Sequence, residues 1–502
     1  MLNLLKENLT RYIQAGFPLI YVRSFEEDKV EQYLTIAACG DEIIEWNATA
    51  FFCDFKSKVT YLEEDKYKNL EDTLRFLEKN SETDLQHKIL LIKDIQTELD
   101  KPGVVALLKR IAQKINEGLA CTVVLLSPVL KIPLELEPYL IVLEMEYPDE
   151  TEIRKVIDAF VQDRGILIEN AGLLEEMTSA FKGLTKYDIN NILCLAYADN
   201  STLTKKDISL IFDQKQQMIK KAGLLEMVPL RESLSDIGGL ENLKAWLRRK
   251  AKILKNLRKA AAFGVDTPKG VLIAGVPGCG KSLSAKAAAK LFEVPLLRLD
   301  IGRLMGKYVG ESEMNLRRAI ALAEAISPCV LWIDEIEKAF AGIGGQSGAA
   351  DITTRLFGNF LTWMQEKKSP VFVVATANNI QEIPMELRRK GRFDELFYVT
   401  FPKVEERKKI FSIHLEKRRK QDIEGIDLKR LADETEKYSG ADIEGAVKEA
   451  IESVFVEGKS KVETETILEV IRDMRPLGES MGEQLKEIEQ SFRDFKLRNA
   501  SI

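Results

Sequence analysis

Residues 270–282 constrain the fold of this chain more than any other stretch. An apolar run at 271–274 leads directly into residues 275–282, which match the pattern G-x-x-x-x-G-K-[ST] at every fixed position. The Ala- and Lys-rich residues that follow, 283–291, predict a helix. Strand, glycine loop and helix in this order form a phosphate-binding unit, because loop N–H groups and the helix N-terminus favour an anion. We therefore predict a parallel α/β sheet with a phosphate site at its edge.

Each fixed residue of this loop has a chemical reason to be there. Gly275, Gly278 and Gly280 let the backbone approach a phosphate closely, because no Cβ stands in the way. Lys281 would contact the β- and γ-phosphates as a point charge, and Ser282 would offer its hydroxyl to Mg²⁺. The alternative is a glycine-rich turn with a solvent-facing lysine, which the flanking strand and helix make less favourable.

A pair of acids follows the apolar run at residues 329–333. Asp334 and Glu335 would lie at the tip of a strand, about 50 residues after the phosphate loop. There, Asp334 could hold Mg²⁺ and Glu335 could orient and activate an attacking water. Two acids after a strand are often only a solvated turn, but the phosphate loop before them makes hydrolysis the expected chemistry.

Composition narrows the class of protein. The 73 basic and 79 acidic residues give a net charge of −6, which argues against a general nucleic-acid binder. The six cysteines form no C-x-x-C pair, so a reducing compartment is expected. His87 and His414 lie far apart in sequence, which disfavours a zinc site or a Ser-His-Asp triad, and we expect both to be structural. No stretch is apolar enough to span a bilayer, and residues 1–13 look unlike a signal or transit peptide, so we expect no membrane insertion.

The first half of the chain predicts a second α/β sheet that lacks a phosphate loop. Apolar runs expected to form strands alternate with helical patterns, which is typical of a largely parallel sheet. Helices are expected from Pro148 to Ala222. The predicted strands are 19–22, 43–46, 89–92 and 122–126, and the helices between them are 26–37 and 104–116.

The two halves share short motifs in the same order, which suggests a tandem duplication. Lys93 of the first half stands where the second half has Asp334, so the first copy would lack a metal-binding carboxylate. The alternative is that α/β sequences simply look alike. The matching positions, 251 to 254 residues apart, are Pro133 and Pro384, Pro148 and Pro402, and Asp188 and Asp442.

Taken in series, the phosphate loop, the acidic pair and residues 391–394 (Gly-Arg-Phe-Asp) resemble the AAA+ ATPases, in particular the AAA subgroup proper. The similarity covers roughly residues 235–458. It implies that Asn378 senses the γ-phosphate and that Arg389 and Arg392 are arginine fingers that reach the neighbouring subunit of a ring, usually a hexamer. The further nucleotide contacts that the resemblance implies are Asp236, Ile237 and Gly238, Val276, Pro277, Cys279 and Leu283, and Gly440 and Ala441 of the lid.

Two stretches resemble the parts with which such rings handle a substrate. Lys307, Tyr308 and Val309 resemble the first pore loop of protein-threading members, where an exposed aromatic residue grips a polypeptide. Residues 341–348 stand at the place of the second pore loop. The alternative for Tyr308 is a side chain that packs into its own subunit and does not contact a substrate. Gln365 and Glu366 stand where the family usually has Asp-Gly, which puts the coupling between subunits in doubt.

A closer resemblance is to the hypothetical AAA-type ATPase family encoded in algal plastid genomes and cyanobacteria. Residues 15–22 and 26–27, the inactive first copy, and residues 476–477 and 500–501 carry it. It implies a location in the bacterial cytoplasm or the plastid stroma. The domains that we expect are a degenerate AAA-like α/β domain (1–145), its helical lid (146–230), an AAA+ ATPase domain (231–400), and a second lid with a last helix (401–502).

The function that we predict is Mg²⁺-dependent ATP hydrolysis by a ring, an expected homohexamer, that remodels a protein client. The fold class is α/β: a P-loop NTPase parallel sheet with a helical lid, preceded by the degenerate AAA-like domain. A nucleic-acid-associated loader is a second hypothesis, disfavoured by the acidic chain and by Gly440-Ala441 in the lid, where such loaders commonly carry a sensor arginine. An ATP-gated scaffold whose output is assembly is a third.

Overall fold

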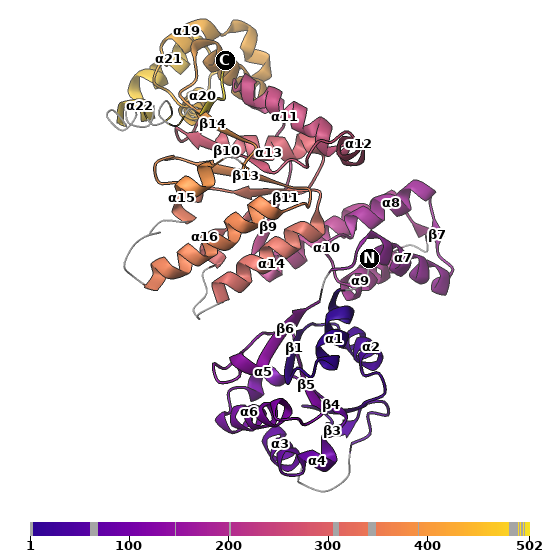
Figure 1. Ribbon diagram of the computed structural model, residues 1–502. Coiled ribbons are helices and arrows are strands. Elements are labelled where there is room, and N and C mark those ends of the chain that lie inside the picture. The colour runs from indigo at the N-terminus through magenta and orange to yellow at the C-terminus, as the bar shows by residue number, and fades with distance from the viewer. Residues whose placement is uncertain are drawn as a thin grey trace. The chain divides into compact units, whose positions relative to one another are not determined.

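The computed structural model divides into two compact units, Met1–Tyr147 and Pro148–Ile502, which we describe separately (Figure 1). In the part of the chain that the structure describes, no helix is long and apolar enough to cross a membrane. The described residues are 4–60, 69–145, 147–199, 202–304, 311–339, 348–389, 391–480, 490, 492, 495 and 497–502.

The first unit is a six-stranded sheet in the order β3-β2-β4-β5-β1-β6, parallel except for β3. Helices α1 and α2 cover one face, and α3 and α6 cover the other. The strands are β1 (Leu19–Arg23), β2 (Glu42–Asn47), β3 (Phe51–Asp54), β4 (Lys88–Lys93), β5 (Cys121–Ser127) and β6 (Leu140–Glu144). The helices are α1 (Leu4–Gln14), α2 (Glu27–Ala37), α3 (Leu70–Lys79), α4 (Ser81–Asp84), α5 (Ile95–Glu98) and α6 (Pro102–Asn116).

The second unit begins with a helical segment that also holds a small two-stranded sheet. It comprises α7 (Glu150–Arg164), β7 (Leu167–Ile168), α8 (Ala171–Ala180), α9 (Lys186–Asp199), β8 (Thr202–Leu203) and α10 (Lys205–Ala222). A seven-stranded sheet follows, in the order β15-β14-β10-β13-β12-β11-β9. Its strands are β9 (Leu225–Val228), β10 (Gly270–Gly275), β11 (Leu296–Leu299), β12 (Cys329–Ile333), β13 (Val371–Ala377), β14 (Glu395–Val399) and β15 (Arg498–Asn499).

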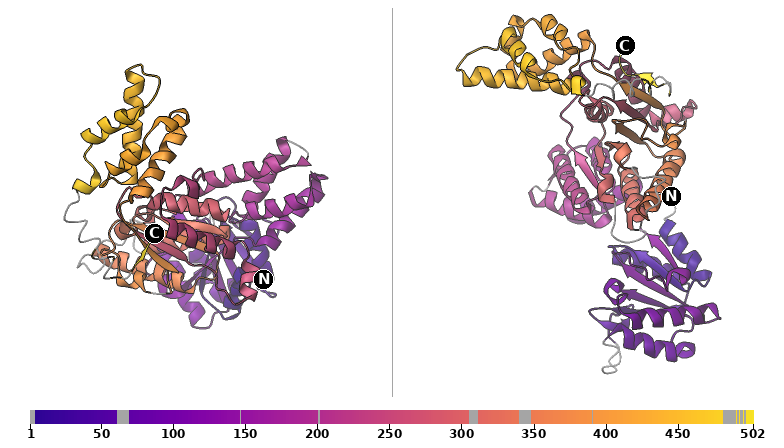
Figure 2. Two further views of the ribbon diagram at one scale, coloured as in Figure 1. Left: turned by 90° about the horizontal axis from the view of Figure 1, so that it is seen from above. Right: turned by 90° about the vertical axis from the view of Figure 1, so that its left-hand side faces the viewer.

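Helices cover both faces of this sheet, and a helical lid follows it along the chain. Alternate residues of β10 point to opposite faces, so Val271 and Ile273 pack with α11 and α13, while Leu272 packs with α14 and α16. The lid forms a helical bundle of its own (Figure 2). The covering helices are α11 (Glu241–Leu254), α12 (Leu257–Ala262), α13 (Lys281–Phe292), α14 (Glu311–Ile326), α15 (Ile336–Ala339), α16 (Gly348–Glu366) and α17 (Met385–Arg388), and the lid helices are α18 (Val404–Arg419), α19 (Leu428–Asp433), α20 (Gly440–Val456), α21 (Thr464–Asp473) and α22 (Leu477–Ser480).

The two sheets share one strand order. In the first unit the parallel strands run β2-β4-β5-β1-β6, and in the second their counterparts run β11-β12-β13-β10-β14. Asp94 and Glu335, which follow the matching strands β4 and β12, both adopt a left-handed backbone, with φ of 54° and 49°. The predicted fold class is confirmed, and the shared order supports our interpretation of the halves as two copies.

Our predictions differ from the structure mainly at short strands, several of which lie at or next to the edges of the sheets. The predicted strands are all present, but we did not predict β3, β6, β7, β8, β9, β11, β14 or β15. Strands β9 and β15 are edge strands of four and two residues, too short to show a clear alternation of apolar residues. The predicted last helix, 481–497, lies for the most part outside the described residues.

A charge network surrounds the last residue of β4, at the position where the second half of the chain carries its acidic pair. The Lys93 ammonium lies 3.1 Å from Glu27 Oε2 and 3.2 Å from Glu45 Oε1, and it also contacts Glu31. Lys58 bonds to Glu31 at 3.0 Å and to Glu45. Burial disfavours the ammonium, but the carboxylates outweigh it and raise the pKa of Lys93. The lysine that replaces Asp334 is therefore held charged by three acids.

We predict that Lys93→Met destabilises the first unit by about 3 kcal/mol, because among the described residues it leaves Lys58 as the single counterion of the carboxylates of Glu31 and Glu45. Hydrogen exchange of β4 and β5 in the full chain measures the loss as faster exchange. Lys101→Met is the matched control, since it removes an exposed ion pair with Glu98 at 2.7 Å and should cost less than about 1 kcal/mol. Equal effects of the two substitutions would contradict the prediction.

Candidate nucleotide site

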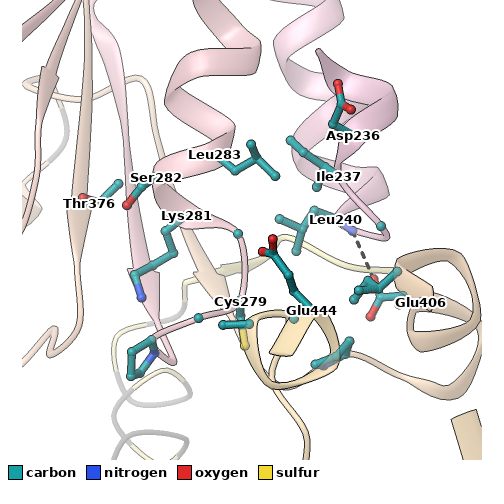
Figure 3. Close-up of a pocket in the computed structure, with 18 of the residues that line it drawn as sticks. Asp236, Ile237, Leu240, Cys279, Lys281, Ser282, Leu283, Thr376, Glu406 and Glu444 are labelled. Carbon is teal, nitrogen blue, oxygen red and sulfur yellow. Dashed lines mark hydrogen bonds between the residues drawn. The ribbon is translucent and has the colours of Figure 1, made fainter. Parts of the chain in front are cut away.

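A cavity of about 430 Å³ lies where the carboxyl edge of the second sheet meets the lid (Figure 3). This is the edge at which open parallel sheets bind ligands. The predicted residues that line it are Asp236, Ile237, Gly238, Pro277, Gly278, Cys279, Gly280, Lys281, Ser282, Leu283, Asp334, Glu335, Asn378, Gly440 and Ala441.

The phosphate loop depends on glycine for its shape. Gly275, Gly278 and Gly280 have φ of 148°, 73° and 86°, which other residues rarely adopt. A Cβ on Gly275 would lie 2.0 Å from the carbonyl oxygen of Val399, so a side chain is also excluded by contact. The loop therefore holds its backbone in the form that a phosphate cradle needs.

Lys281 begins helix α13 and is almost fully buried. Its ammonium donates to the carbonyl oxygens of Gly275 at 2.8 Å and Val276 at 2.9 Å, so these two residues contact the lysine although neither lines the cavity. Burial lowers the pKa of Lys281 to about 8. The charge of this lysine is therefore sensitive to what lies beside it.

Oxygen ligands converge beside the lysine. The Ser282 hydroxyl donates to Asp334 Oδ1 at 3.2 Å, and the Thr376 hydroxyl donates to the same oxygen. A hydroxyl and a carboxylate fit Mg²⁺, which usually takes one or two protein oxygens and completes its shell with phosphate and water. Among the described residues there is no group of three or more His, Cys, Asp or Glu able to hold a metal, so these two ligands would need phosphate oxygens to complete a magnesium site.

Glu335 and Asn378 lie in contact at the tips of β12 and β13. Asn378 Nδ2 donates to Glu335 Oε1 at 3.0 Å, and Lys338 Nζ lies 2.8 Å from Glu335 Oε2. Mainly through Lys338, the pKa of Glu335 is lowered, so the carboxylate is ionised at neutral pH. The Asn378 backbone N–H donates to Glu337 at 2.9 Å, which fixes the strand end that carries the asparagine.

The loop before α11 lies directly on the lid. A Cβ on Gly238 would come within 2.4 Å of Ile410 in α18, and one on Gly239 within 2.3 Å of Glu406 Oε1. The Leu240 backbone N–H donates to Glu406 Oε1 at 3.1 Å, as the dashed line in Figure 3 marks. The two glycines therefore allow loop and lid to share one wall of the cavity.

Helix α20 closes the cavity from the side of the phosphate loop. The Ala441 backbone N–H donates to the Gly278 carbonyl at 3.0 Å. Ser439 and Asp442 form a capping box that begins the helix at this point. The predicted lid residues thus reach the phosphate loop through the backbone.

His414 lines the cavity. This position differs from our expectation that the histidine is purely structural. Its Nδ1 lies 4.0 Å from Glu444 Oε1 and 3.4 Å from an Arg418 nitrogen, and burial lowers the pKa of the ring. Its spacing of four residues from Ile410 on α18 could have indicated a shared face. The lining residues that we did not predict include Thr376, Glu406, Ile410, His414, Glu444 and Ser501.

Both predicted arginine fingers lie away from the cavity of their own chain. Arg389 is exposed, and Arg392 donates to the carbonyl of Glu386. Neither lines the cavity. The predicted pore residues Lys307, Tyr308 and Val309 lie outside the described residues, as do residues 341–347 of the second pore loop.

Comparison with known sequences identifies the class of protein. Residues 271–401 match the model of the ATPase family associated with various cellular activities (AAA), and 425–469 match the AAA+ lid domain. Residues 5–145 and 151–222 match the N-terminal and second domains of SpoVK-like AAA ATPases. The chain is therefore an AAA ATPase, and ATP hydrolysis is its activity.

Its relatives of similar length place it more narrowly. The AAA domain-containing protein ycf46 of Guillardia theta is 36% identical over 97% of this chain and 95% of its own length. The ycf46 protein of Pyropia yezoensis is 34% identical over 99% of both chains. The chain belongs to the ycf46 family of AAA proteins. The ATP-dependent zinc metalloprotease FtsH of Aster yellows witches'-broom phytoplasma is 35% identical, but over only 44% of this chain and 32% of its own.

We predict that nucleotide affinity falls as pH rises above about 8. A triphosphate favours a charged Lys281, which is already protonated below its pKa of about 8 and must take up a proton above it. The dissociation constant of a non-hydrolysable ATP analogue should therefore approach a tenfold rise per pH unit above pH 8. Titration calorimetry in buffers of different ionisation enthalpy measures the proton uptake directly.

The control for this prediction is Lys286→Met on the same helix. Lys286 pairs with Glu232 at 3.0 Å, and its loss should leave the pH profile unchanged. A dissociation constant that stays flat between pH 7 and 9 in the unsubstituted chain would contradict the role given to Lys281.

Proposed function

We propose that this ATPase is a Mg²⁺-dependent ring, a homohexamer, that couples hydrolysis to the remodelling of a protein client. The observation that carries the hydrolytic part is the set of contacts that joins Ser282, Asp334, Glu335 and Asn378 beside the phosphate loop. They bring a metal ligand pair and an ionised acid to one end of the cavity.

In this proposal each residue has a separate task. Mg²⁺, when bound, would neutralise charge that develops on the phosphates, held by Ser282 and Asp334. Glu335 accepts the proton of the attacking water, and Asn378 keeps that carboxylate aimed at the γ-phosphate. Lys281 binds the phosphate oxygens, and its proton stays on the lysine throughout. Water loses its proton to Glu335 as the γ-phosphoryl group leaves ADP.

The ring part of the proposal rests on the two arginines. Arg389 and Arg392 do not line the cavity of their own chain, so a site that needs a guanidinium on the γ-phosphate must receive it from a neighbour. A head-to-tail contact of this kind closes into a ring when the rotation between subunits allows it. A monomer is then expected to hydrolyse ATP poorly.

The client part of the proposal rests on relatives and on charge. The FtsH relative is named an ATP-dependent metalloprotease, and we infer that the shared ATPase part likewise acts on protein. The net charge of −6 disfavours the alternative of a nucleic-acid loader. Tyr308 is the residue that we propose to grip the client. The third hypothesis, an ATP-gated scaffold, is separated from the others by whether turnover accompanies assembly.

We further propose the domain limits and the location. Boundaries near residues 145, 230 and 400 agree with the family matches at 5–145, 151–222, 271–401 and 425–469. The first copy would then be a scaffold or a client-docking module without a nucleotide site. The bacterial cytoplasm or the plastid stroma is the compartment that we propose.

The test of the shared site is ATP turnover against protein concentration, with molar mass followed by light scattering. Specific activity should rise as the chain assembles. Glu335→Gln should keep nucleotide binding but lower turnover at least about 100-fold, because it removes the proton acceptor. Arg392→Ala should lower turnover without preventing ATP binding. Arg430→Ala is the control, since Arg430 pairs with Glu465 on the surface of the lid.

Two outcomes would contradict the proposal. Turnover that does not depend on concentration, or full turnover by Arg392→Ala, would show that the sites are not shared between subunits. Assembly that responds to ATP in a chain with no turnover would favour the scaffold hypothesis.

A further inference from the structure

Residues 498–502 lie along the edge of the second sheet and reach the cavity. Strand β15 pairs in parallel with β14, and the Ala500 backbone N–H donates to the Tyr398 carbonyl at 3.0 Å. Ala500 is fully buried and Ser501 is 6% exposed, although both are small residues of a short edge segment. Ser501 is also one of the residues that line the cavity.

This segment caps the helix that follows the loop at 236–240. Helix α11 has no side-chain cap at its N-terminus, where Leu240 adopts a left-handed backbone. The Ala500 carbonyl accepts instead from the backbone N–H groups of Asn242 at 3.0 Å and Leu243 at 3.1 Å. The Asn242 side-chain amide donates a hydrogen bond of 2.6 Å to the Ser501 carbonyl. The segment therefore fixes the loop through the helix that it leads into.

The same segment is joined to the lid through one carboxylate. The Ser501 hydroxyl donates to Glu406 Oε1 at 2.7 Å, and this oxygen also accepts from the Leu240 backbone N–H. Glu406 belongs to lid helix α18. One oxygen thus connects residues 498–502, the loop at 236–240 and the lid.

We propose that residues 498–502 form a latch that sets nucleotide affinity by holding the lid against the loop at 236–240, with Ser501 acting as a positioning residue through Glu406. The proposal rests on the ATP site proposed above. A base bound between loop and lid gains affinity when both walls are already fixed, because less motion is lost on binding.

The latch should act on binding and release rather than on the chemical step. In Figure 3, Glu406 and Leu240 lie on one side of the cavity and Ser282 and Thr376 on the other. Glu335 contacts Thr376 on the far side through its backbone N–H. A loss at the latch should therefore change KM and the dissociation constant of ADP while leaving kcat largely unchanged.

Ser501→Ala in the full chain tests this with ADP and Mg²⁺ in titration calorimetry and with steady-state ATP turnover. The dissociation constant of ADP and the KM for ATP should rise about tenfold, the size expected for a lost bond to a charged acceptor. The kcat at saturating ATP should stay within about twofold of the unsubstituted chain.

Ser412 lies on lid helix α18, as Glu406 does, and provides a matched control. Ser412 donates to Glu416 at 2.7 Å, the same kind of bond, but it does not line the cavity. Ser412→Ala should leave ADP affinity unchanged. In a double-mutant cycle, Ser501→Ala should add little to the effect of Glu406→Gln, because both substitutions act on the same hydrogen bond between residues 498–502 and the lid.

Hydrogen exchange gives a second readout, because ADP should not change the exchange rate of a segment with only a structural role. ADP should slow exchange of the Ala500 amide if occupancy tightens the latch. The proposal is overturned if Ser501→Ala binds ADP as tightly as Ser412→Ala, if kcat falls as much as affinity, or if ADP leaves the exchange of residues 498–502 unchanged.

Lys281→Ala separates failure of the latch from failure of the site. If Lys281→Ala loses nucleotide affinity and Ser501→Ala does not, the latch alone is wrong. If Lys281→Ala keeps full affinity, the ATP site on which the latch depends is wrong as well.

Discussion

The close approach of Gly275 to the end of β14 is the contact on which the second unit depends. The Val399 carbonyl leaves no room for a side chain at Gly275 and accepts the Val276 backbone N–H at 3.0 Å. It therefore anchors the start of the phosphate loop at the point where the chain leaves the sheet for the lid. Because Thr400 and Pro402 line the cavity directly afterwards, one carbonyl positions both walls of the site.

The end of the cavity at the phosphate loop and the end at which we propose that the base binds are held by different interactions. At the phosphate end, a buried ammonium faces carbonyl oxygens and nearby carboxylates, so its charge state and the electrostatics decide binding. At the base end, glycine contacts and neutral donors to Glu406 hold loop and lid together. A change of pH should therefore alter mainly the interactions at the phosphate end. Loss of the Ser501 hydroxyl should alter mainly those at the base end.

The sequence predicts the strands whose apolar runs are continuous, such as β4, β5, β10 and β12. Strand β10, the acidic pair and Asn378 all lie as their spacing suggests. What it does not reveal are contacts between segments far apart in the chain. Arg498 and Asn499 are polar and form a strand only because β14 offers an open edge. The bond from Ser501 to Glu406 likewise follows from that pairing and leaves no local pattern.

The two sheets show how one strand order can occur with and without the residues of a phosphate site. Asp94 keeps the left-handed turn of Glu335, so the tip after β4 has the same backbone form as the tip after β12. The strand β1, however, reaches α2 through residues 24–26, without the glycines that expose backbone N–H groups. Lys93 also occupies the position at which the second half has Asp334, and three acids already neutralise the charge of this lysine. A phosphate there would have to displace carboxylates from a buried lysine, so the interactions that stabilise the first copy are also those that disfavour a nucleotide in it.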